Sequence, residues 1–349
     1  MEMKRLTIRD VAERAGVSLG TVSNVLNRPH LVADATRKRV LAVVDEIGFV
    51  RNNAARQLRG VTSPAIGLVA LDTYNPFFAE VARGIERAAD EANHLVIVCN
   101  SAGLKAREDR QLRVLEEQRV AGILMAPLRG SQSRAMRAIR NRGTPIVLLD
   151  RRGSGRDQCS VSVDDIGGAR MVAEHLVSLG HERIGLVNGP RTIQQCADRH
   201  AGFLNGLDKA GLSLSPSSDL EMPGMTIQDG EEAAARLLAQ RWRPTAIFCT
   251  NDLLAVGAQH AFLARGVHVP DDLAIVGYDD VAFAEMSFVP LTSVRRPAYD
   301  LGYQATKLLL DESSNRLQHR HERVLFKPEL IVRESTRSTG ERSRPVVLT

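Results

Sequence analysis

Residues 6–27 read LTIRDVAERAGVSLGTVSNVLN and predict two short helices joined by a tight turn. Thr7 and Asp10 have the spacing of a capping box, and the apolar residues that follow recur at helical intervals. Gly16 can adopt the positive φ that commonly ends a helix, and Ser18 then supplies an N-cap for a second helix. So short a turn holds two helices at a steep angle, which is typical of a helix-turn-helix.

The predicted second helix has an outer face of small or hydrogen-bonding side chains and no carboxylate. These residues are Leu19, Gly20, Ser23, Asn24 and Asn27. Such a face can approach a polyanion without charge repulsion. A third helix is predicted from about residue 34 to 47, and the apolar stripes of the three helices would close on one another. Generic packing of capped helices is the alternative interpretation.

Positive charge is concentrated at this end of the chain. Residues 1–60 hold eleven Lys and Arg against six Asp and Glu, which equals the formal net charge of +5 of all 349 residues, so the rest is neutral. A small basic head on a neutral body indicates a polyanionic partner, whereas an ordinary solvated surface is the alternative. The length suits two or three folded domains, and the 44% hydrophobic content excludes a disordered chain.

The segment RNNAARQLRG, residues 51–60, follows the predicted bundle and carries Leu58 as its large apolar side chain. An isolated helix of this length is marginal in water, so we expect it to order only when something holds it. An exposed leucine on a basic helix suits insertion between base steps in the minor groove, where it would kink the duplex. A plain linker is the alternative.

From residue 65 onward, short apolar runs alternate with amphipathic stretches. The runs are AIGLVAL, LVIVCN, GILMAP, PIVLLD, RIGLVNG, TAIFCT and LAIVGYD. Helical patterns such as FAEVARGIERAADEAN, DIGGARMVAEHLVSLG and DGEEAAARLLAQ lie between them. This alternation is typical of parallel βα units and predicts an open, doubly wound α/β sheet, or two of them.

In such sheets ligands bind beyond the carboxyl ends of the strands, where this sequence places carboxylates, amides and aromatic rings. The candidates are Asp72 to Phe78, Asp150 with Arg151, Asp164 with Asp165, Asn251 with Asp252, and Asp279 with Asp280. Together with Arg199 as a bidentate donor, they suit a polyhydroxylated ligand such as a sugar. Its apolar face would stack on Tyr74, Phe77 or Phe78. Helix capping is the alternative role at 164–165 and 251–252, and a simple turn is the alternative for Asn75-Pro76.

Motifs of catalysis and metal binding give no support for an enzyme. The sequence lacks a nucleophile elbow, a phosphate loop, a zinc-protease motif and a dinucleotide fingerprint. No pair of cysteines has metal-ligand spacing, so all four are predicted to fill space in the core: Cys99, Cys159, Cys196 and Cys249. HRHER at 319–323 is interpreted as an exposed charge run. We therefore expect no catalytic residue, metal or cofactor, and without a leader or a long apolar run we expect a cytoplasmic location.

Over essentially its whole length the sequence resembles the LacI/GalR family of bacterial transcription regulators. TIRDVAERAGVSLGTVSNVLN is similar to the family's helix-turn-helix signature, and NNAARQLRG to its hinge helix. The stretches similar to its regulatory core are, in order, NPFF, HLVSLGHERIGLVNGP, DRHAGF, PTAIFCTND, VPDDLAIVGYDD and PLTSVRRP. Each is weak alone, but their joint order is specific.

The resemblance implies an N-terminal all-α helix-turn-helix bundle and an α/β core like the periplasmic sugar-binding proteins, with two Rossmann-like subdomains and three crossovers. The bundle would take residues 1–50, the hinge helix and linker 51–62, the effector-binding and dimerisation core 63–337, and a polar tail 338–349. Within the core, the N-subdomain would comprise 63–163 and 294–323, and the C-subdomain 164–293 and 324–337.

The resemblance also implies which residues contact DNA. Leu19, Gly20 and Asn24 match base-reading positions; Gly20 has no side chain, so Asn24 would pair with adenine and Leu19 would touch a thymine methyl. The matches to phosphate-contacting positions are Thr7, Ser18, Thr21, Asn27 and Thr36, and Ser23 on the outer face is a further DNA-binding candidate. In the hinge, Leu58 matches a leucine wedge, with Ala55 and Asn53 beside it, and Arg51 stands where a proline is common.

Other positions match the family's effector contacts. They are Arg199, Asn251 and Asp279, followed by Phe77, Phe78, Asp150 and Arg151. A ligand in the cleft would bridge the subdomains and favour one of two core arrangements. Ribose is our first candidate, because the NPFF loop and the residues of the other motifs resemble those of ribose-type and purine-type members of the family. Other sugars, nucleosides and purines stay open, as does the choice between induction and co-repression.

We therefore expect a repressor that acts as a homodimer on double-stranded operator DNA, with one head per half-site. The tail RSTGERSRPVVLT, residues 337–349, has no leucine heptads, which predicts a dimer rather than a tetramer. Two alternatives belong to other classes. A periplasmic-type solute-binding protein would share the core without the basic head, and a sugar-modifying enzyme would need a nucleophile and a base.

Overall fold

The computed structural model describes residues 6–50, 63–128, 133–153, 157–241 and 243–337. Its contacts divide the chain into two units, residues 1–63 and 64–349, and each is described by itself. We call the first the N-terminal unit and the second the core. Among the described residues, no helix is both long enough and apolar enough to cross a membrane.

The N-terminal unit is a bundle of three α-helices. Its elements are α1 (Ile8–Ala15), α2 (Leu19–Asn27), the 3-10 turn η1 (Pro29–Leu31) and α3 (Asp34–Glu46). Asp10 accepts a 2.6 Å hydrogen bond from the backbone N of Thr7, and Gly16 ends α1 with a φ of 62°. Ser18 Oγ accepts from Thr21 N at 3.0 Å and caps α2. The predicted capping box, turn and N-cap are therefore confirmed.

Six buried side chains, mostly valine, hold these helices together. They are Val11, Ala12, Ala15, Val22, Val25 and Val40, drawn from all three helices. None of these helices has enough residues to be stable alone in water, so each depends on the apolar stripes of the other two. The packing fixes the direction of α2 and leaves its outer face to solvent.

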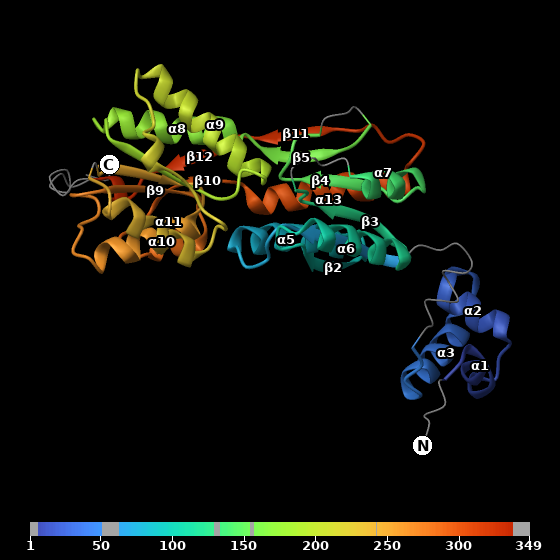
Figure 1. The fold of residues 1–349 in the computed structure, drawn as a ribbon. Helices are drawn as coiled ribbons and strands as arrows, with labels where there is room; N and C mark the ends of the chain where they lie inside the picture. Colours follow the sequence, from blue (N-terminus) through green and yellow to red (C-terminus); the bar gives the residue numbers. More distant parts are fainter. Residues whose placement is uncertain (1–5, 51–62, 129–132, 154–156, 242, 338–349) are drawn as a thin grey trace, which may run out of the picture. The chain divides into compact units, whose positions relative to one another are not determined.

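The core contains two six-stranded sheets, which we call sheet A and sheet B (Figure 1). Sheet A has the order β11-β5-β4-β3-β1-β2, and sheet B has the order β12-β10-β9-β8-β6-β7. The strands of sheet A are β1 (Ser63–Ala70), β2 (Leu95–Asn100), β3 (Val120–Met125), β4 (Ile146–Leu149), β5 (Ser160–Val163) and β11 (Arg323–Phe326). Those of sheet B are β6 (Ile184–Asn188), β7 (Asp219–Glu221), β8 (Ala246–Cys249), β9 (Ala274–Asp279), β10 (Thr292–Arg295) and β12 (Glu329–Ile331).

Helices cover both faces of each sheet. Around sheet A they are α5 (Pro76–Glu91), α6 (Lys105–Glu117), α7 (Arg134–Asn141) and α13 (Ala298–Ser314). Around sheet B they are α8 (Asp165–Ser178), α9 (Gln194–Lys209), α10 (Ile227–Leu238) and α11 (Asp252–Leu263), and shorter pieces are η2 (Pro216–Ser218), α12 (Ala282–Met286) and η3 (Glu334–Thr336). Along β1, Ile66 and Leu68 join one apolar cluster while Ala65 and Val69 join the cluster on the opposite face. Such alternation is what a strand buried on both faces requires.

The chain crosses between the sheets three times. β10 pairs with β9 in sheet B, and α13, which follows it, packs against α5 and sheet A. In Figure 1, α13 is the orange helix that lies among the green and teal elements of sheet A. β11 then pairs with β5, and β12 pairs with β10. The predicted boundaries at 293/294 and 323/324 cut through β10 and β11 and are wrong, because a hydrogen-bonded ladder keeps each strand within one sheet.

α5 and α13 approach each other at two glycines. A Cβ added at Gly84 would lie 2.0 Å from the carbonyl oxygen of Tyr299, and one added at Gly302 would lie 2.1 Å from that of Val81. The two helices therefore meet backbone to backbone, which fixes α13 against the sheet that it joins only after the second crossing.

Candidate functional site

The N-terminal unit carries its predicted DNA-binding residues at its surface. Thr7, Ser18, Leu19, Gly20, Asn24 and Asn27 are exposed, whereas Thr21, Ser23 and Thr36 are half-buried. Leu19 is 42% exposed, so its side chain is available at the surface. The hinge predictions Asn53, Ala55 and Leu58 lie outside the described residues.

Gly20 has no role in forming α2. A Cβ added there would meet only Ser18 Oγ, at an ordinary 3.6 Å. Inside a helix glycine costs about 0.5–1 kcal/mol relative to alanine. Neither the backbone conformation nor the packing requires glycine here. Without a side chain, this part of the exposed helix surface lets another backbone or a phosphate come close.

Two aspartates in the core occupy strained backbone positions at the ends of strands. Asp150 follows β4 with a φ of 54°, and Asp279 ends β9 with a φ of 108°. Residues other than glycine adopt positive φ infrequently, and Asp is among those that tolerate it best. Both strand ends lie at the carboxyl edges of their sheets, where ligands of open α/β folds bind.

Two arginines bind these aspartates and a third carboxylate. Arg296, which follows β10, pairs with Asp150 and at 3.2 Å with Asp279. Arg199, on α9, pairs with Asp165 at 3.0 Å and with Asp279 at 3.6 Å. All five side chains are at most 6% exposed. We call this group the buried ion cluster; its two guanidiniums partly offset three carboxylates in a region that water hardly reaches.

Side chains at the cluster connect the two subdomains directly. Asn75, at the start of α5, donates from Nδ2 to Asp279 Oδ2 at 3.1 Å. Gln195, on α9, donates from Nε2 to Asp150 Oδ2 at 3.0 Å. These bonds join sheet A elements to sheet B elements without any intervening molecule.

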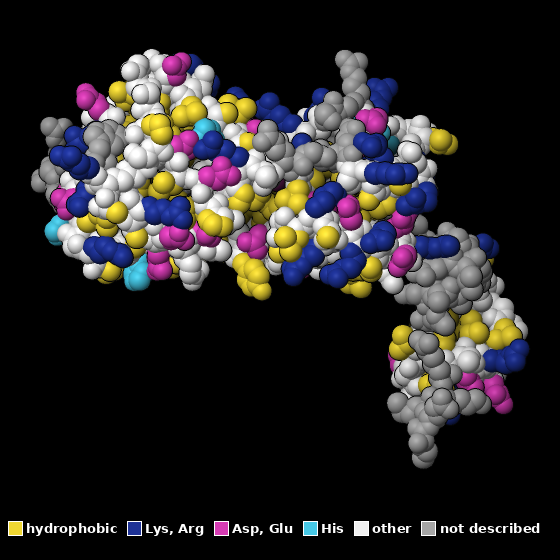
Figure 2. Space-filling view, viewed as in Figure 1, with side chains coloured by type: hydrophobic (Ala, Val, Ile, Leu, Met, Phe, Trp, Pro, Cys, Tyr) yellow, Lys and Arg dark blue, Asp and Glu magenta, His cyan; other side chains and the backbone are white. Residues whose placement is uncertain are grey.

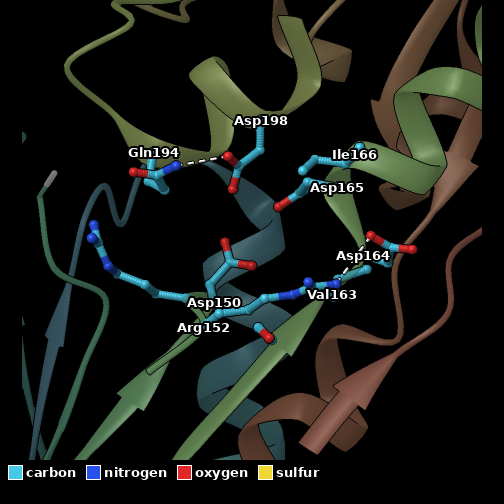
Figure 3. A pocket seen from close by; sticks show the side chains of 10 residues that line it. Asp150, Arg152, Val163, Asp164, Asp165, Ile166, Gln194 and Asp198 are labelled. Carbon is cyan, nitrogen blue, oxygen red and sulfur yellow. Dashed lines mark hydrogen bonds and ion pairs between the residues drawn. The ribbon is translucent and has the colours of Figure 1, made fainter. Parts of the chain in front are cut away.

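A pocket of about 250 Å³ opens beside the buried ion cluster. Its lining comes from the ends of β4 and β5 and from α8 and α9: Asp150, Arg151, Arg152, Ser162, Val163, Asp164, Asp165, Ile166, Gln194 and Asp198. The carboxylates of Asp150, Asp165 and Asp198 point toward the same space (Figure 3). Gln194 holds Asp198 through a 2.7 Å hydrogen bond. The pocket is therefore polar and shared by both subdomains.

Burial raises the pKa of the Asp150 carboxyl above its ordinary value, although the Arg296 guanidinium opposes that shift. Burial also raises the pKa of Asp198, against the hydrogen bond from Gln194. Both carboxylates are thus poorly solvated acceptors. Ligand hydroxyl groups could hydrogen-bond to them in place of water.

Three of the polar candidates after strands make contacts within the fold, and of these only Asp164 also lines the pocket. Asn251 is 1% exposed; its Oδ1 accepts from Leu254 N at 2.9 Å and its Nδ2 donates to Met225 O at 3.0 Å. It caps α11, as the alternative interpretation held, and is absent from the pocket lining. Asp164 likewise caps α8, and Asp252 accepts from Ser293 and from the backbone of Val281.

The two predicted phenylalanines divide between site and core. The ring of Phe77 lies beneath the Arg296 guanidinium, 3.8 Å from its carbon, so Phe77 supports the buried ion cluster. Phe78 packs edge-on against Phe77 within the apolar cluster between α5 and sheet A. Arg151 lines the pocket and donates to Leu128 O at 3.3 Å, whereas Tyr74 is 85% exposed.

Four residues of the site were not predicted from the sequence: Arg296, Gln194, Gln195 and Asp198. For Asp165, ligand binding and helix capping were both left open. Two signals were available. Arg296 directly follows β10 in the motif PLTSVRRP, the same strand-end position as the predicted aspartates. Gln195 lies four residues before Arg199, which places both on one face of a helix.

Charge on the core surface is mixed. Over the face shown in Figure 2, Lys and Arg side chains of the core lie interspersed with Asp and Glu. This agrees with the neutral balance of the sequence beyond residue 60. The basic excess belongs to the N-terminal segment.

Comparison with known families matches two parts of the chain. Residues 7–52 match "Bacterial regulatory proteins, lacI family", and residues 173–336 match "Periplasmic binding protein-like domain". The chain is 34% identical over 333 residues to the HTH-type transcriptional repressor PurR of Photobacterium profundum, covering 95% of this chain and 98% of that protein. It is also 34% identical to the HTH-type transcriptional regulator DegA of Bacillus subtilis, with 95% and 98% covered.

Solved structures of similar fold cover nearly the whole chain. A lac repressor dimer bound to operator and the anti-inducer ONPF shares 29% identity with a TM-score of 0.82, covering 96% of this chain and all of that one. The transcriptional regulator CelR in complex with cellobiose shares 29% identity with a TM-score of 0.71, over 95% and 100% of the two chains.

A helix-turn-helix bundle followed by a two-subdomain periplasmic-binding-like core defines a DNA-binding transcription regulator, not an enzyme. The predicted fold class is confirmed. Within this class, the chain belongs to the lacI family of bacterial regulatory proteins.

Proposed function

We propose that this protein is a cytoplasmic repressor whose operator affinity is controlled by a small neutral polyhydroxylated effector bound in the pocket beside the buried ion cluster. The observation that carries the proposal is the convergence of Asp150, Asp165 and Asp198 on one space from elements of both subdomains. A ligand there touches both halves of the core. It can therefore shift their relative arrangement by its differential affinity for the two states.

The charge of the lining selects the class of effector. Four aspartates and two arginines line the pocket. Carboxylates accept hydrogen bonds from sugar hydroxyls, whereas the phosphate of a sugar phosphate would meet like charge. Ribose is our first candidate. A LacI family transcriptional regulator from Enterococcus faecium was solved with bound ribose. It shares 29% identity with this chain and has a TM-score of 0.70, over 78% of this chain and 98% of that one. Other neutral sugars, nucleosides and purines are its competitors.

The unliganded core is held by direct contacts between its subdomains. The Asn75–Asp279 and Gln195–Asp150 hydrogen bonds and the Arg296–Asp150 ion pair cross the site. A ligand that bonds to these groups replaces protein partners with its own hydroxyls and changes how closely the subdomains approach. In a homodimer this motion would set the spacing of the two segments that lead to the DNA-binding heads, and a similar structure is a lac repressor dimer bound to operator.

The exposed face of α2 would read the major groove. Asn24 can bond both N6 and N7 of adenine, Leu19 can touch a thymine methyl, and Gly20 lets the helix come close. Ser18 and Thr21, whose hydroxyl oxygens lie 2.9 Å apart at the start of α2, would contact phosphate at a helix N-terminus. Leu58 would enter the minor groove between the half-sites.

A thermal-shift screen of the full chain against neutral sugars, sugar phosphates, nucleosides and nucleobases tests the effector class. We expect a neutral polyhydroxylated compound to raise the melting temperature and to change operator affinity in a fluorescence-anisotropy titration, in either direction. Asp198→Asn should lower effector affinity about tenfold or more, because this carboxylate lines the pocket and a hydrogen bond to a charged group is lost. Asp208→Asn, an exposed change on the same helix as Arg199, should leave it unchanged. Stabilisation by sugar phosphates alone would contradict the proposal.

A further inference from the structure

Four potential metal ligands from distant parts of the sequence meet at one end of sheet A. Cys159 immediately precedes β5, Glu312 lies near the end of α13, and His319 and His321 lie in the segment between α13 and β11. One ligand atom from each lies within 4.8 Å of the others. In the part of the chain that the structure describes, this is the group with such spacing. We call it the Cys-His cluster.

The distances within the Cys-His cluster approach those of a tetrahedral metal site. Cys159 Sγ lies 3.2 Å from His319 Nε2 and 3.7 Å from His321 Nδ1. Each of these nitrogens lies 3.9 Å from Glu312 Oε2. Around a zinc ion with bonds of about 2.0–2.3 Å, tetrahedral ligand atoms lie about 3.3–3.6 Å apart. The nitrogen–oxygen distances of 3.9 Å exceed these separations, so side chains would have to move closer together on binding the ion.

One buried atom of the cluster lacks a protein partner. Glu312 Oε2 is enclosed and accepts no hydrogen bond, and the Glu312 side chain as a whole is 15% exposed. The neighbouring His319 side chain is 2% exposed, and Cys159 is fully buried. An enclosed carboxylate oxygen without a partner is costly, and a cation placed among these groups would satisfy it.

Two groups outside the four candidate ligands orient His319 and Cys159. His319 Nδ1 lies 2.6 Å from Asp311 Oδ2, so that nitrogen carries the proton and Nε2 presents its lone pair to the cluster. The backbone N of Glu322 donates to Cys159 Sγ at 3.3 Å. A carboxylate behind a metal-binding imidazole is the usual means of fixing its tautomer and ring orientation.

We propose that Cys159, Glu312, His319 and His321 bind a Zn²⁺ ion. A thiolate, two imidazoles and a carboxylate suit zinc and do not suit Mg²⁺ or Ca²⁺, which prefer oxygen ligands alone. The thiol binds as thiolate and its proton passes to solvent. Four protein ligands close the coordination sphere, which is the arrangement of a structural site.

The position of the site indicates what the ion holds together. β5 and β11 are parallel neighbours, with Ser160 opposite Arg323, and the cluster lies at their amino ends. The ion would join the start of β5 to the segment that brings the chain from α13 into β11 (Figure 1). The pocket lies at the opposite, carboxyl end of β5, so the two sites are separate. The interpretation of residues 319–323 as an exposed charge run is wrong for His319, because its side chain is 2% exposed.

Metal content and cobalt spectroscopy of the untagged full-length protein test the proposal. After removal of metal with a chelator, incubation with Zn²⁺ and gel filtration, we expect one zinc per chain by atomic emission. Co²⁺ in place of Zn²⁺ should give intense visible bands of tetrahedral cobalt and a near-ultraviolet band from the thiolate. Cys159→Ser should abolish the thiolate band, and Cys99→Ser, which removes a cysteine outside the cluster, should retain it.

A variant of Asp311, which contacts His319 but is not one of the four ligands, keeps the test independent of folding defects. Asp311 is half-exposed, so Asp311→Asn should fold normally while weakening Zn²⁺ binding 10- to 100-fold in competition with a chromogenic chelator. Asp300→Asn, an exposed change on the same helix, should bind zinc like the unmodified chain. Zinc below 0.2 equivalents in the unmodified protein, a thiolate band that survives Cys159→Ser, or equal affinity in Asp311→Asn would each overturn the proposal.

Discussion

The guanidinium carbon of Arg296 lies 3.8 Å from the centroid of the Phe77 ring, so the guanidinium stacks on that ring. Arg296 follows β10 of sheet B, whereas Phe77 belongs to α5, the first helix of the other subdomain. From that position the same guanidinium binds Asp150 and Asp279, which end strands in different sheets. One planar cation thus touches an aromatic face and two carboxylates where the subdomains meet. An ammonium group has neither the planar fork nor the stacking face for this.

Arg296→Lys should therefore be far from conservative. We expect it to lower the free energy of unfolding by about 2 kcal/mol or more, because the buried carboxylates lose part of their compensation. Urea denaturation of the full chain would measure this. The matched control is Arg295→Lys: its side chain is 51% exposed and pairs with Asp280, so the change should stay within about 0.5 kcal/mol. Equal effects of both variants would contradict this reading of the cluster.

Gly84→Ala should destabilise the core by about 1–3 kcal/mol, because its Cβ has no room beside the Tyr299 carbonyl. The two helices would have to separate, and α13 would lose its fit on sheet A. Thermal unfolding followed by circular dichroism would report the loss. Unchanged stability would show that α5 and α13 can move apart without cost.

Gly20→Ala should have the opposite sign for folding. The added methyl group has space and improves helix propensity, so the N-terminal unit should gain about 0.5–1 kcal/mol. Operator affinity should fall, because the methyl group occupies the surface that we assign to close approach of DNA. Anisotropy titrations at several salt concentrations would measure binding. A variant that is more stable and binds operator equally well would remove Gly20 from the interface.

Leu58→Ala should weaken operator binding about 10- to 100-fold and leave effector binding unchanged, because a leucine between base steps contributes only when DNA is present. Gel shift and calorimetry measure the two affinities on one preparation. Equal losses in both would contradict the proposed minor-groove role.

Two half-buried histidines should make the core less stable in mild acid. Burial lowers the pKa of His175 and of His181 below the model-compound value of 6.5, and Arg337 adds to the effect at His175. The folded state thus resists protonation more than the unfolded chain does. This contribution to stability is complete above pH 6.5 and is lost as the pH falls toward the lowered values. Melting temperatures should drop from pH 7.5 to 5.5, and less so for a His175→Gln, His181→Gln variant.

Local patterns predicted the framework well. The seven apolar runs all form strands, and the capping box, Gly16 and Ser18 set the ends of the first helices as expected. These features depend on neighbours a few residues away. The stretch SVSV of β5 escaped notice because two of its four residues are serine, although all four are buried.

Long-range partners limited the prediction of the site. Asn251 and Asp279 were both predicted to contact the effector, with capping as the alternative for Asn251; Asn251 caps a helix, and Asp279 binds two arginines. The difference arises from Arg199 and Arg296, which reach Asp279 from another helix and another strand end. The Cys-His cluster was hidden for the same reason, since Cys159 and His319 lie 160 positions apart.

The late return of the chain to sheet A has a consequence for synthesis. β5 is completed at Val163, but the strand that covers its outer edge, β11, is made only after nearly all of sheet B has been translated. A nascent chain therefore carries an open strand edge while its second sheet emerges, and such edges recruit other chains. Ribosome-bound intermediates that end before residue 323 should thus depend most on chaperones.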